Sequence, residues 1–342
     1  MPDLYVIILA GGASSRFWPL SGDAHPKYLL KPDGDHTLIE SAWQRACLCT
    51  DPSRVIVVTG GAQAHLIREA LPDLDASNLC VEPARRDTAA AIALGCKRVH
   101  ALDAHADVLV LPADTLLEPA ESLHDGVKLA RSQPDYRDAI HVFGVNPARA
   151  EGGFGYIEPG EQLAEGVISV QGFTEKPGSV QAAKFAEMGY LWNIGCFLFS
   201  LQTFDRELHK HLPQHSSRLR PVTPDQPTEA EYEQLDAVSI DFGLIEKVDN
   251  LRAIKLDAAF DDIGTWDALI ARLEKSGRTP QEAISISGQG NCAAGEATAV
   301  AVVGESNLLV VVSEGKVLVL KRGHGQDVKG VASRQDAKTP RR

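Results

Sequence analysis

The sequence predicts an α/β protein in which a mostly parallel, Rossmann-like sheet is flanked by helices and followed by a small C-terminal β-module. Two observations lead to this expectation. Apolar runs rich in β-branched residues alternate with helical patterns through more than half of the 342-residue chain, as in βαβ units. After residue 283 short apolar runs follow one another between Gly, Asn and Ser turns, which is typical of an all-β segment.

The alternation begins at residues 5–9, an entirely apolar run. Such a run is typical of a strand buried on both faces at the centre of a parallel sheet. Strands are next expected at residues 54–59, 108–111 and 140–145, and helices between them at 62–71, 88–103 and 120–132. The elements expected after these are strands at 153–158 and 167–173, a helix at 179–188 and a strand at 196–200. We expect this second group to form an insertion over one edge of the sheet.

The C-terminal third of the chain has a different pattern of polar and apolar residues. A polar stretch at residues 213–233 predicts a surface loop with a short acidic helix. A helix is expected at 266–275, and short strands at 297–303, 307–312 and 316–320. Their near-regular spacing predicts a β-helix-like solenoid of a few coils. The expected organisation is therefore a main domain at 1–278, a β-module at 279–331 and a disordered tail at 332–342.

A module this small cannot bury its own faces. We expect it to pack on the main domain or on another subunit, and therefore expect a homodimer formed through it.

The composition excludes several classes of partner. The net charge of −12 argues against a nucleic-acid or anionic-membrane surface, where a basic face is expected. The chain enters its first strand without a basic leader, and no run of about 18 apolar residues is present after it, so we expect a cytoplasmic protein.

The cysteines form no CxxC pair, which favours buried free thiols over disulfides or a zinc site. They are Cys47, Cys49, Cys80, Cys96, Cys196 and Cys292.

The segment after the first strand has the features of a phosphate-binding loop. Gly11 and Gly12 let the backbone turn and bring its N–H groups close to an anion, and Arg16 and Lys27 supply positive charge. A loop at the carboxyl end of a central strand in a parallel sheet faces the ligand crevice. The alternative is an ordinary glycine turn, since neither the dinucleotide fingerprint nor the P-loop pattern is present.

Two acidic positions are candidates for a metal site. Asp114 directly follows an expected strand, and Asp262 precedes an expected helix. Two carboxylates from distant parts of the chain leave coordination positions open for water and phosphate oxygens, which suits a nucleotide-bound magnesium ion. Each position also has a structural alternative: Asp114 as an Asx turn or helix cap, and Asp262 or Thr265 as the cap of the following helix.

Two further segments carry groups that suit a sugar phosphate. Glu175 and Asn193 can accept and donate hydrogen bonds to sugar hydroxyls, and Lys176 can neutralise a phosphate. The Glu-Lys-Pro run ends an expected strand, so an ordinary strand terminus is the alternative.

Taken in order, these segments resemble those of the sugar-nucleotide pyrophosphorylases, and most closely those of the mannose-1-phosphate guanylyltransferases. The similarity runs the length of the chain. The matching segments are Gly11 to Ser21 with Pro26-Lys27, Glu82 to Thr88, Pro112 to Asp114, Gly153 to Ile157, Glu175 to Pro177, Trp192 to Gly195, Ser239 to Phe242, Asp262 to Trp266, and Ser306 to Val312 with Gly325 to Lys329.

The resemblance implies a nucleotidyltransferase-type fold and a magnesium-dependent transfer of GMP from GTP to mannose 1-phosphate, which yields GDP-mannose and pyrophosphate. Arg16, Lys27 and Lys176 would act on the phosphates. The remaining implied roles are nucleotide binding by Leu9, Gly11, Gly12, Glu82, Asp87, Thr88 and Asp114, sugar-phosphate binding by Gly155, Glu175, Lys176 and Asn193, and Mg²⁺ binding by Asp114 and Asp262.

Some residues depart from the family pattern. Ser14 stands where the family has a third glycine, which costs about 1–2 kcal/mol if its φ must be positive. Asp87 replaces an asparagine near the base, and Ile194 replaces a serine beside the sugar. A different nucleotide or sugar 1-phosphate, such as a heptose or glucose, therefore stays open as the substrate. A non-catalytic regulatory relative is the other alternative, although the charged residues that the reaction requires are all retained.

Overall fold

A computed structural model describes residues 1–12, 14–20, 22, 24–219, 228–277, 281–295 and 299–331. Contacts divide the chain into two compact units: Met1–Gly11 with Ala42–Phe260 form the first unit, and Gly12–Ser41 with Asp261–Arg342 form the second unit. The segment that carries Arg16 and Lys27 thus belongs with the C-terminal part of the chain. The domain boundary expected at residue 278 stays a prediction, and the expected tail lies outside the described residues.

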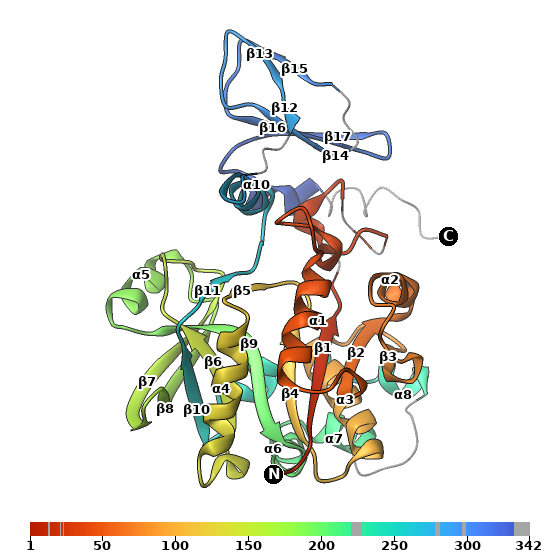
Figure 1. Cartoon of the computed structure of the whole chain (residues 1–342), viewed down its shortest axis with the longest axis vertical. Helices are drawn as coiled ribbons and strands as arrows, with labels where there is room; N and C mark the ends of the chain where they lie inside the picture. Colours follow the sequence, from red (N-terminus) through yellow and green to blue (C-terminus); the bar gives the residue numbers. More distant parts are fainter. Residues whose placement is uncertain are drawn as a thin grey trace. The chain divides into compact units, whose positions relative to one another are not determined.

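The first unit is built on a sheet whose nine described strands follow the order β3-β2-β1-β4-β9-β6-β10-β8-β7 (Figure 1). The strands are β1 (Leu4–Ala10), β2 (Val55–Gly60), β3 (Leu79–Glu82), β4 (Asp107–Pro112), β6 (Ile140–Val145), β7 (Gly155–Ala164), β8 (Val167–Glu175), β9 (Leu191–Ser200) and β10 (Leu251–Leu256). The pairs from β3 to β4 are parallel, as is β6 with β10. Both β9 and β8 run antiparallel to their neighbours. The other strands of this sheet point the same way. The expected α/β class is therefore confirmed, but the sheet is mixed and not mostly parallel, because β8 and β9 bring antiparallel pairings into it.

The helices along this part of the chain are α1 (Leu38–Cys49), α2 (Ala64–Ala70), α3 (Asp87–Leu102), α4 (Glu121–Ser132), α5 (Ser179–Glu187), α6 (Leu201–His211), α7 (Pro213–Leu219), α8 (Glu229–Glu233) and α9 (Ile240–Gly243). The sequence did not lead us to expect α1, although Thr37 and Glu40 form a capping box at its start. The Thr37 N–H donates to Glu40 Oε2 at 2.6 Å, and the Glu40 N–H donates to Thr37 Oγ1 at 3.2 Å. The S/T-x-x-E spacing was the available signal.

The expected insertion over the sheet edge is wrong for β9. This strand lies inside the sheet between β4 and β6, with Val108 opposite Phe199 and Val142 opposite Phe197. Its nearly continuous apolar sequence is what burial on both faces requires. Of the strands expected in the insertion, β7 lies at one edge of the described sheet with β8 next to it, and β3 lies at the other edge.

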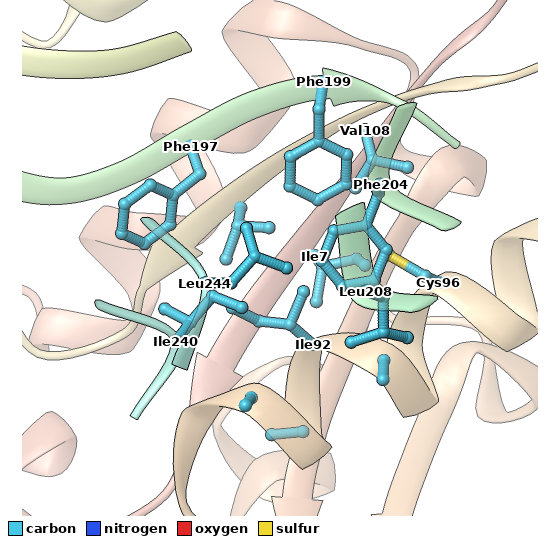
Figure 2. Close-up of a cluster of buried hydrophobic side chains, with 14 of the residues drawn as sticks. Ile7, Ile92, Cys96, Val108, Phe197, Phe199, Phe204, Leu208, Ile240 and Leu244 are labelled. Atoms are coloured by element: carbon cyan, nitrogen blue, oxygen red, sulfur yellow. The ribbon is translucent and has the colours of Figure 1, made fainter. Parts of the chain in front are cut away.

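The core of the first unit lies where α3, α6 and α9 contribute apolar side chains that pack against the sheet (Figure 2). Gly95 of α3 permits a close approach, because a Cβ there would lie 2.8 Å from the Cδ1 of Ile7 in β1. The aromatic rings of Phe199 and Phe204 stack with centroids 4.6 Å apart. Each fully buried side chain of this size contributes about 1.5–3 kcal/mol to folding, so this cluster anchors the helices that carry several candidate site residues.

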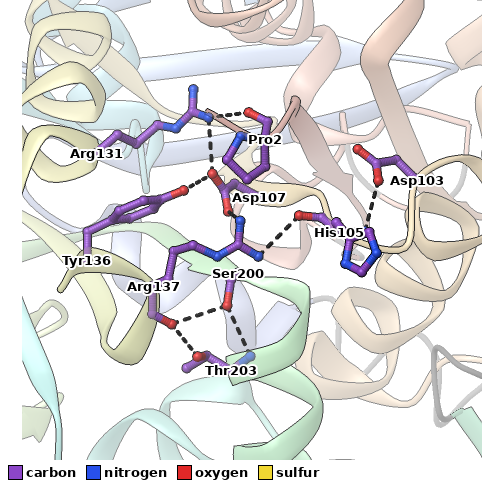
Figure 3. Close-up of polar contacts among 9 residues, drawn as sticks. All are labelled: Pro2, Asp103, His105, Asp107, Arg131, Tyr136, Arg137, Ser200 and Thr203. Atoms are coloured by element: carbon purple, nitrogen blue, oxygen red, sulfur yellow. Dashed lines mark hydrogen bonds and ion pairs between the residues drawn. The ribbon is translucent and has the colours of Figure 1, made fainter. Parts of the chain in front are cut away.

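A charged network closes the amino end of β4 (Figure 3). Asp107 has no exposed side-chain surface, and its carboxylate lies 3.1 Å from Arg131 Nη2 and 3.2 Å from Arg137 Nη1. The hydroxyl of Tyr136 also donates to it. Burial raises the pKa of Asp107, whereas the two arginines act to lower it. The two arginines therefore compensate the buried charge of Asp107. Asp107 lies at the amino end of β4, and Asp114 follows the carboxyl end of the same strand.

The second unit contains α10 (Trp266–Lys275) and the C-terminal strands β12 (Gln281–Glu282), β13 (Ile284–Ile286), β14 (Cys292–Gly295), β15 (Ala301–Val303), β16 (Leu308–Ser313) and β17 (Lys316–Lys321). Two pairs are parallel and have the same offset of 17 residues, as Ile284 opposite Ala301 and Cys292 opposite Leu309 show. By contrast, β12–β14 and β16–β17 are antiparallel. The expected small β-module is present, and its β-helix-like form stays a prediction.

The structure also bears on the cysteines and on membrane spanning. All six cysteines are free thiols. Cys96, Cys196 and Cys292 are buried, as expected, whereas Cys47, Cys49 and Cys80 are half-buried. Within the described part of the chain, no helix has both the length and the apolar character needed to cross a bilayer.

Candidate active site

Three neighbouring strands bring the candidate sugar-binding residues together. Gly155 begins β7 and lies opposite Glu175, the last residue of β8. Asn193 is on β9, which pairs with β7 through Tyr156 and Trp192. A Cβ added to Gly155 would lie 2.6 Å from Glu175 Oε2 and 3.4 Å from Asn193 Cβ. Residues separated by up to 38 positions therefore form one polar cluster, and glycine is required at its centre.

The side chain of Asn193 is held in one orientation. Its Oδ1 accepts a hydrogen bond from the Gly195 N–H at 3.2 Å, and its Nδ2 donates to Asp241 Oδ1 at 3.3 Å. Burial, and secondarily the charge of Glu175, raises the pKa of Asp241 to about 7. Asp241 was not among the candidate site residues. The sequence did contain a signal for Asp241, because the Ser-Ile-Asp-Phe segment in which it lies matches the family pattern.

Lys176 supplies a cation at the edge of this cluster. Its ammonium group pairs with the Glu175 carboxylate, and its side chain is 65% exposed against 10% for Glu175. The backbone of Lys176 has a φ of +50°, which is unfavourable for a residue with a side chain. The cluster thus combines one accessible cation with hydrogen-bonding groups beneath it, as recognition of a phosphorylated hydroxyl compound requires.

The candidate base-binding residues lie at the end of β3 and at the start of α3. Glu82 Oε1 accepts a hydrogen bond at 2.8 Å from the hydroxyl of Tyr232, and burial raises the pKa of Glu82. Asp87 has a φ of +63°, and its Oδ1 accepts from the Thr88 N–H at 2.7 Å. Asp and Asn tolerate this left-handed conformation better than most residues, so Asp87 satisfies the backbone requirement of the asparagine that it replaces.

Thr88 has a structural bond of its own. Its Oγ1 accepts a hydrogen bond from the backbone N–H of Ile240 at 2.8 Å. This bond ties the start of α3 to α9, the helix that carries Asp241. This hydrogen bond between a side chain and the backbone therefore links the elements that carry the candidate base-binding residues and Asp241.

Gly11 and Gly12, the two glycines after β1, differ in whether their backbone conformation requires glycine. Gly12 has a φ of +107°, whereas Gly11 has no positive φ and no atom within 4 Å of an added Cβ. Leu9 accepts a backbone hydrogen bond from Ala113 at 3.1 Å. Only Gly12 is thus conformationally required to be glycine, while both glycines leave the space beside them open.

Ser14 adopts the left-handed conformation that the family pattern implies for a glycine, with φ 49° and ψ 33°. Its hydroxyl oxygen accepts a hydrogen bond from the backbone N–H of Lys27 at 2.6 Å. Its carbonyl accepts from the Phe17 N–H at 2.9 Å, which closes the turn that carries Arg16. The serine thus offsets its conformational cost with a bond that glycine lacks.

Asp114 follows β4 and precedes β5 (Leu116–Glu118), so no helix begins at this residue for it to cap. Arg45 of α1 contacts the residue that follows Asp114. Its side chain is buried, with the residue 4% exposed, and its Nη2 donates to the Thr115 carbonyl at 2.9 Å. Burial lowers the pKa of Arg45, and the charge of Asp114 opposes this shift. Arg45 was not identified from the sequence, because nothing in its local pattern distinguishes it from a surface arginine.

Thr265, and not Asp262, caps α10, since Thr265 Oγ1 accepts from the Ala268 N–H at 3.3 Å. Asp262 is followed by Ile263, a buried β-branched residue with a φ of +43°. A Cβ on Gly264 would lie 2.9 Å from Asp262 Oδ2. Strain of this kind, about 1–3 kcal/mol, is characteristic of functional segments.

Asp114 and Asp262 are suitable donors for a hard divalent cation. Mg²⁺ is usually bound through one or two carboxylates together with substrate phosphates and water. In the described residues no group of three or more His, Cys, Asp or Glu side chains has metal-binding geometry. Asp114 belongs to the first unit and Asp262 to the second unit, so their joint role belongs to the proposal below.

Comparison with known proteins identifies the class. Residues 5–278 match the family described as Nucleotidyl transferase, and the chain belongs to this family. The protein is therefore a nucleotidyltransferase, an enzyme of a family that generally uses divalent metal ions. The α/β sheet and the polar clusters at the ends of its strands are consistent with this class.

Individual relatives narrow the similarity further. XanB, a xanthan biosynthesis protein of Xanthomonas campestris, is 30% identical over 347 residues that cover 97% of this chain and 73% of XanB. The mannose-1-phosphate guanylyltransferase ManC of Salmonella typhimurium is 31% identical, with 97% of this chain and 73% of ManC covered. A crystal structure from Thermus thermophilus, described as a mannose-1-phosphate geranyltransferase, has a TM-score of 0.86 and 28% identity, covering 98% of this chain and 99% of its own.

Proposed function

We propose that this enzyme transfers GMP from GTP to α-D-mannose 1-phosphate and so forms GDP-mannose and pyrophosphate. The observation that carries the proposal is the cluster of Gly155, Glu175, Asn193 and Asp241 with Lys176 at its edge. It offers donors and acceptors for a hexose beside a cation for its phosphate. ManC, a relative over nearly the whole chain, is named for this substrate.

The attacking group is a phosphate oxygen that is already ionised at neutral pH, so no protein nucleophile is required. The tasks left to the protein are alignment and charge neutralisation. In this proposal Lys176 holds the sugar phosphate, and Glu175 and Asn193 hold the ring hydroxyls above Gly155. Arg16 and Lys27 neutralise the triphosphate as pyrophosphate leaves, while the backbone at Leu9, Gly11 and Gly12 approaches the nucleotide. Glu82, Asp87 and Thr88 lie on the base side.

Asp114 and Asp262 would hold a magnesium ion. When bound, Mg²⁺ stabilises negative charge that builds up on the phosphates. The two carboxylates suit it, because their oxygens are hard donors and they leave positions for phosphate oxygens. Arg45 supports Asp114 through the neighbouring carbonyl.

The test is pyrophosphate release by the purified full-length chain with Mg²⁺, each nucleoside triphosphate in turn and a panel of sugar 1-phosphates. We expect release only with GTP and mannose 1-phosphate. Release with a different pair, such as a glucose or heptose 1-phosphate, would move the assignment to another pyrophosphorylase of this fold. No release with any pair would favour a regulatory, non-catalytic protein.

We further propose that the enzyme is a homodimer formed through its C-terminal module. Ile284 and Ile286 of β13, which point to the same side, are 61% and 55% exposed, and Val317 and Val319 of β17 are 56% and 58% exposed. β17 is also the edge of its sheet. Exposed aliphatic side chains on β13, and on a strand that is an edge among the described residues, suit a second copy of the same module.

The dimer proposal is tested by the mass of the enzyme in solution. Light scattering is expected to give a dimer for the wild type and a monomer for Ile286→Asp with Val319→Asp. Val180→Asp is the matched control, because Val180 is 75% exposed but lies in α5 of the first unit. A monomeric wild type, or a dimer that survives the double substitution, would contradict the proposal.

A further inference from the structure

We propose that the C-terminal loop, residues 323–328, is a positioning element for the turn Ser15–Phe17, and that Gln326 orients the guanidinium group of Arg16 in that turn. This inference rests on the function proposed above, in which Arg16 acts on the triphosphate. Gln326 itself touches no substrate in the proposal and acts only through Arg16. The two loops lie at opposite ends of the sequence but within the same second unit.

The direct link is a side-chain hydrogen bond. Arg16 Nη1 donates to Gln326 Oε1 at 3.4 Å, across 310 positions of the sequence. An arginine side chain has many rotamers, and fixing it when the nucleotide binds opposes binding. An acceptor that holds the guanidinium beforehand reduces this cost. Because a guanidinium has five N–H donors, one bond to Gln326 leaves donors for phosphate oxygens.

The C-terminal loop is itself clamped by a carboxylate. Asp267, the second residue of α10, accepts two backbone hydrogen bonds, from the Gly323 N–H to Oδ1 and from the Gly325 N–H to Oδ2, each at 2.8 Å. Hydrogen bonds to an ionised acceptor are stronger than those between neutral groups. The loop therefore has a fixed position on the first turn of α10, and Gln326 follows directly after the clamped glycine.

The neighbouring residue holds the other loop. Trp266 Nε1 donates to the carbonyl of Trp18 at 3.1 Å, and the Trp266 ring packs edge-on against Phe17 with centroids 5.4 Å apart. Both Phe17 and Trp266 are buried. Consecutive residues of α10 thus hold the turn that carries Arg16 and the loop that carries Gln326. The contact between the two side chains is a consequence of this shared support.

Gly325 fits this arrangement because it has no side chain. A Cβ there would lie 2.7 Å from Asp267 Oδ2 and 2.9 Å from Thr265 Cβ, whereas a Cβ on Gly330 would meet no atom of the described residues within 4 Å. Contacts below 3.0 Å force a displacement of one partner. The chain therefore offers a matched pair of glycine substitutions, one that displaces the C-terminal loop and one that does not.

The first experiment measures steady-state kinetics of Gln326 variants of the full-length enzyme. We expect Gln326→Ala to raise the KM for GTP about threefold to tenfold, with little change in the KM for mannose 1-phosphate. Asp327→Ala is the control, since Asp327 lies in the same turn but faces His324 at the surface.

A double-mutant cycle separates positioning from a general effect on folding. In an Arg16→Ala background, Gln326→Ala is expected to have no further effect on the KM for GTP, because the group it positions is gone. Additive effects of the two substitutions, or equal effects of Gln326→Ala and Asp327→Ala, would overturn the proposal.

A second readout does not depend on catalysis. Trypsin cleavage at the Arg16–Phe17 bond, followed by mass spectrometry, is expected to be several times faster in Gly325→Ala than in the wild type or Gly330→Ala. If the wild type releases no pyrophosphate with any substrate pair, the proposed function fails, while this contrast still tests the support of the loop. Equal cleavage rates for the two glycine variants would show that the C-terminal loop does not hold the Arg16 turn.

Discussion

The side-chain amide of Asn193 donates a hydrogen bond to the carboxyl group of Asp241, with 3.3 Å between Nδ2 and Oδ1. Asn193 lies on a strand inside the sheet and Asp241 on a four-residue helix, α9. The pKa of Asp241 is raised to about 7, first by burial and then by the charge of Glu175. This contact places a carboxyl group that changes its charge near neutral pH within the candidate sugar site.

Asp241 is expected to make the stability of the protein depend on pH. Its folded-state pKa of about 7 lies above the ordinary value of 3.8, so the native state retains a proton that the unfolded state releases. The resulting stabilisation is present below about pH 4 and is lost as the pH rises through about 7. Asp241→Asn should therefore raise the free energy of unfolding by about 1–3 kcal/mol at about pH 8 and change it little at about pH 4.

Urea denaturation across this pH range measures the effect. Asp257→Asn, an exposed position, serves as the control. An equal difference between Asp241→Asn and the wild type at both ends of the range would refute the assignment.

Gly155→Ala is expected to disrupt the sugar site while leaving the fold intact. The added methyl group would lie 2.6 Å from Glu175 Oε2 and displace that carboxylate. We expect kcat/KM for mannose 1-phosphate to fall on the order of 10- to 100-fold, with a much smaller change in the KM for GTP. Gly61→Ala is the control, because the nearest atom to its Cβ is 3.8 Å away. A uniform loss for both substrates would point to misfolding of β7 instead.

Asp262→Asn tests the proposed metal ligand. The amide keeps the size of the side chain but loses the charge that binds a divalent ion, so we expect turnover to fall on the order of 100-fold. The Mg²⁺ concentration for half-maximal activity should also rise, and Asp114→Asn should behave alike. Pyrophosphate release against Mg²⁺ concentration measures both effects, with Asp257→Asn as control. Full turnover of Asp262→Asn at the wild-type Mg²⁺ concentration would disprove the two-carboxylate site.

Two substitutions of Ser14 separate backbone strain from the hydrogen bond. Ser14→Gly relieves the positive φ but removes the bond to Lys27, two effects of about 1 kcal/mol each that oppose one another. Ser14→Ala keeps the strain and also loses the bond, so it should destabilise by about 1 kcal/mol more than Ser14→Gly. Thermal unfolding of the two variants gives the comparison. If both melt at the same temperature, the positive φ of residue 14 carries no measurable strain.

Much of the first unit could be predicted from local patterns. The expected strand at 140–145 coincides with β6, as the expected helix at 266–275 does with α10 of the second unit. Hydrophobic periodicity encodes such elements because each is stabilised by its own apolar face. The place of β9 inside the sheet is different, since strand order depends on pairing between distant segments that periodicity does not report. A strand at the centre of a sheet and a strand at its edge can have the same pattern of apolar residues.

Some residues of the candidate site could likewise be predicted from the sequence, and others could not. Gly155, Glu175 and Asn193 were expected from their chemistry, and strand pairing brings them together. Asp241 was missed although its segment matches the family pattern. Arg45 was missed because its significance lies in its burial and in its contact with Thr115, far along the chain. Asp262 and Thr265 were both left open as the cap of α10, since both side chains are good caps, and the hydrogen bond from the Ala268 N–H to Thr265 decides between them.

The composition of the second unit has a practical consequence for engineering. A chimera made by exchanging everything after residue 278 would separate the segment Gly12–Ser41 from the partners that it contacts in its own chain. Those partners include Gln326, which bonds to Arg16, and Glu314, whose Oε1 lies 3.0 Å from His25 Nε2. A functional exchange between relatives therefore needs two donor segments, Gly12–Ser41 and the segment that begins at Asp261, because both belong to the same compact unit.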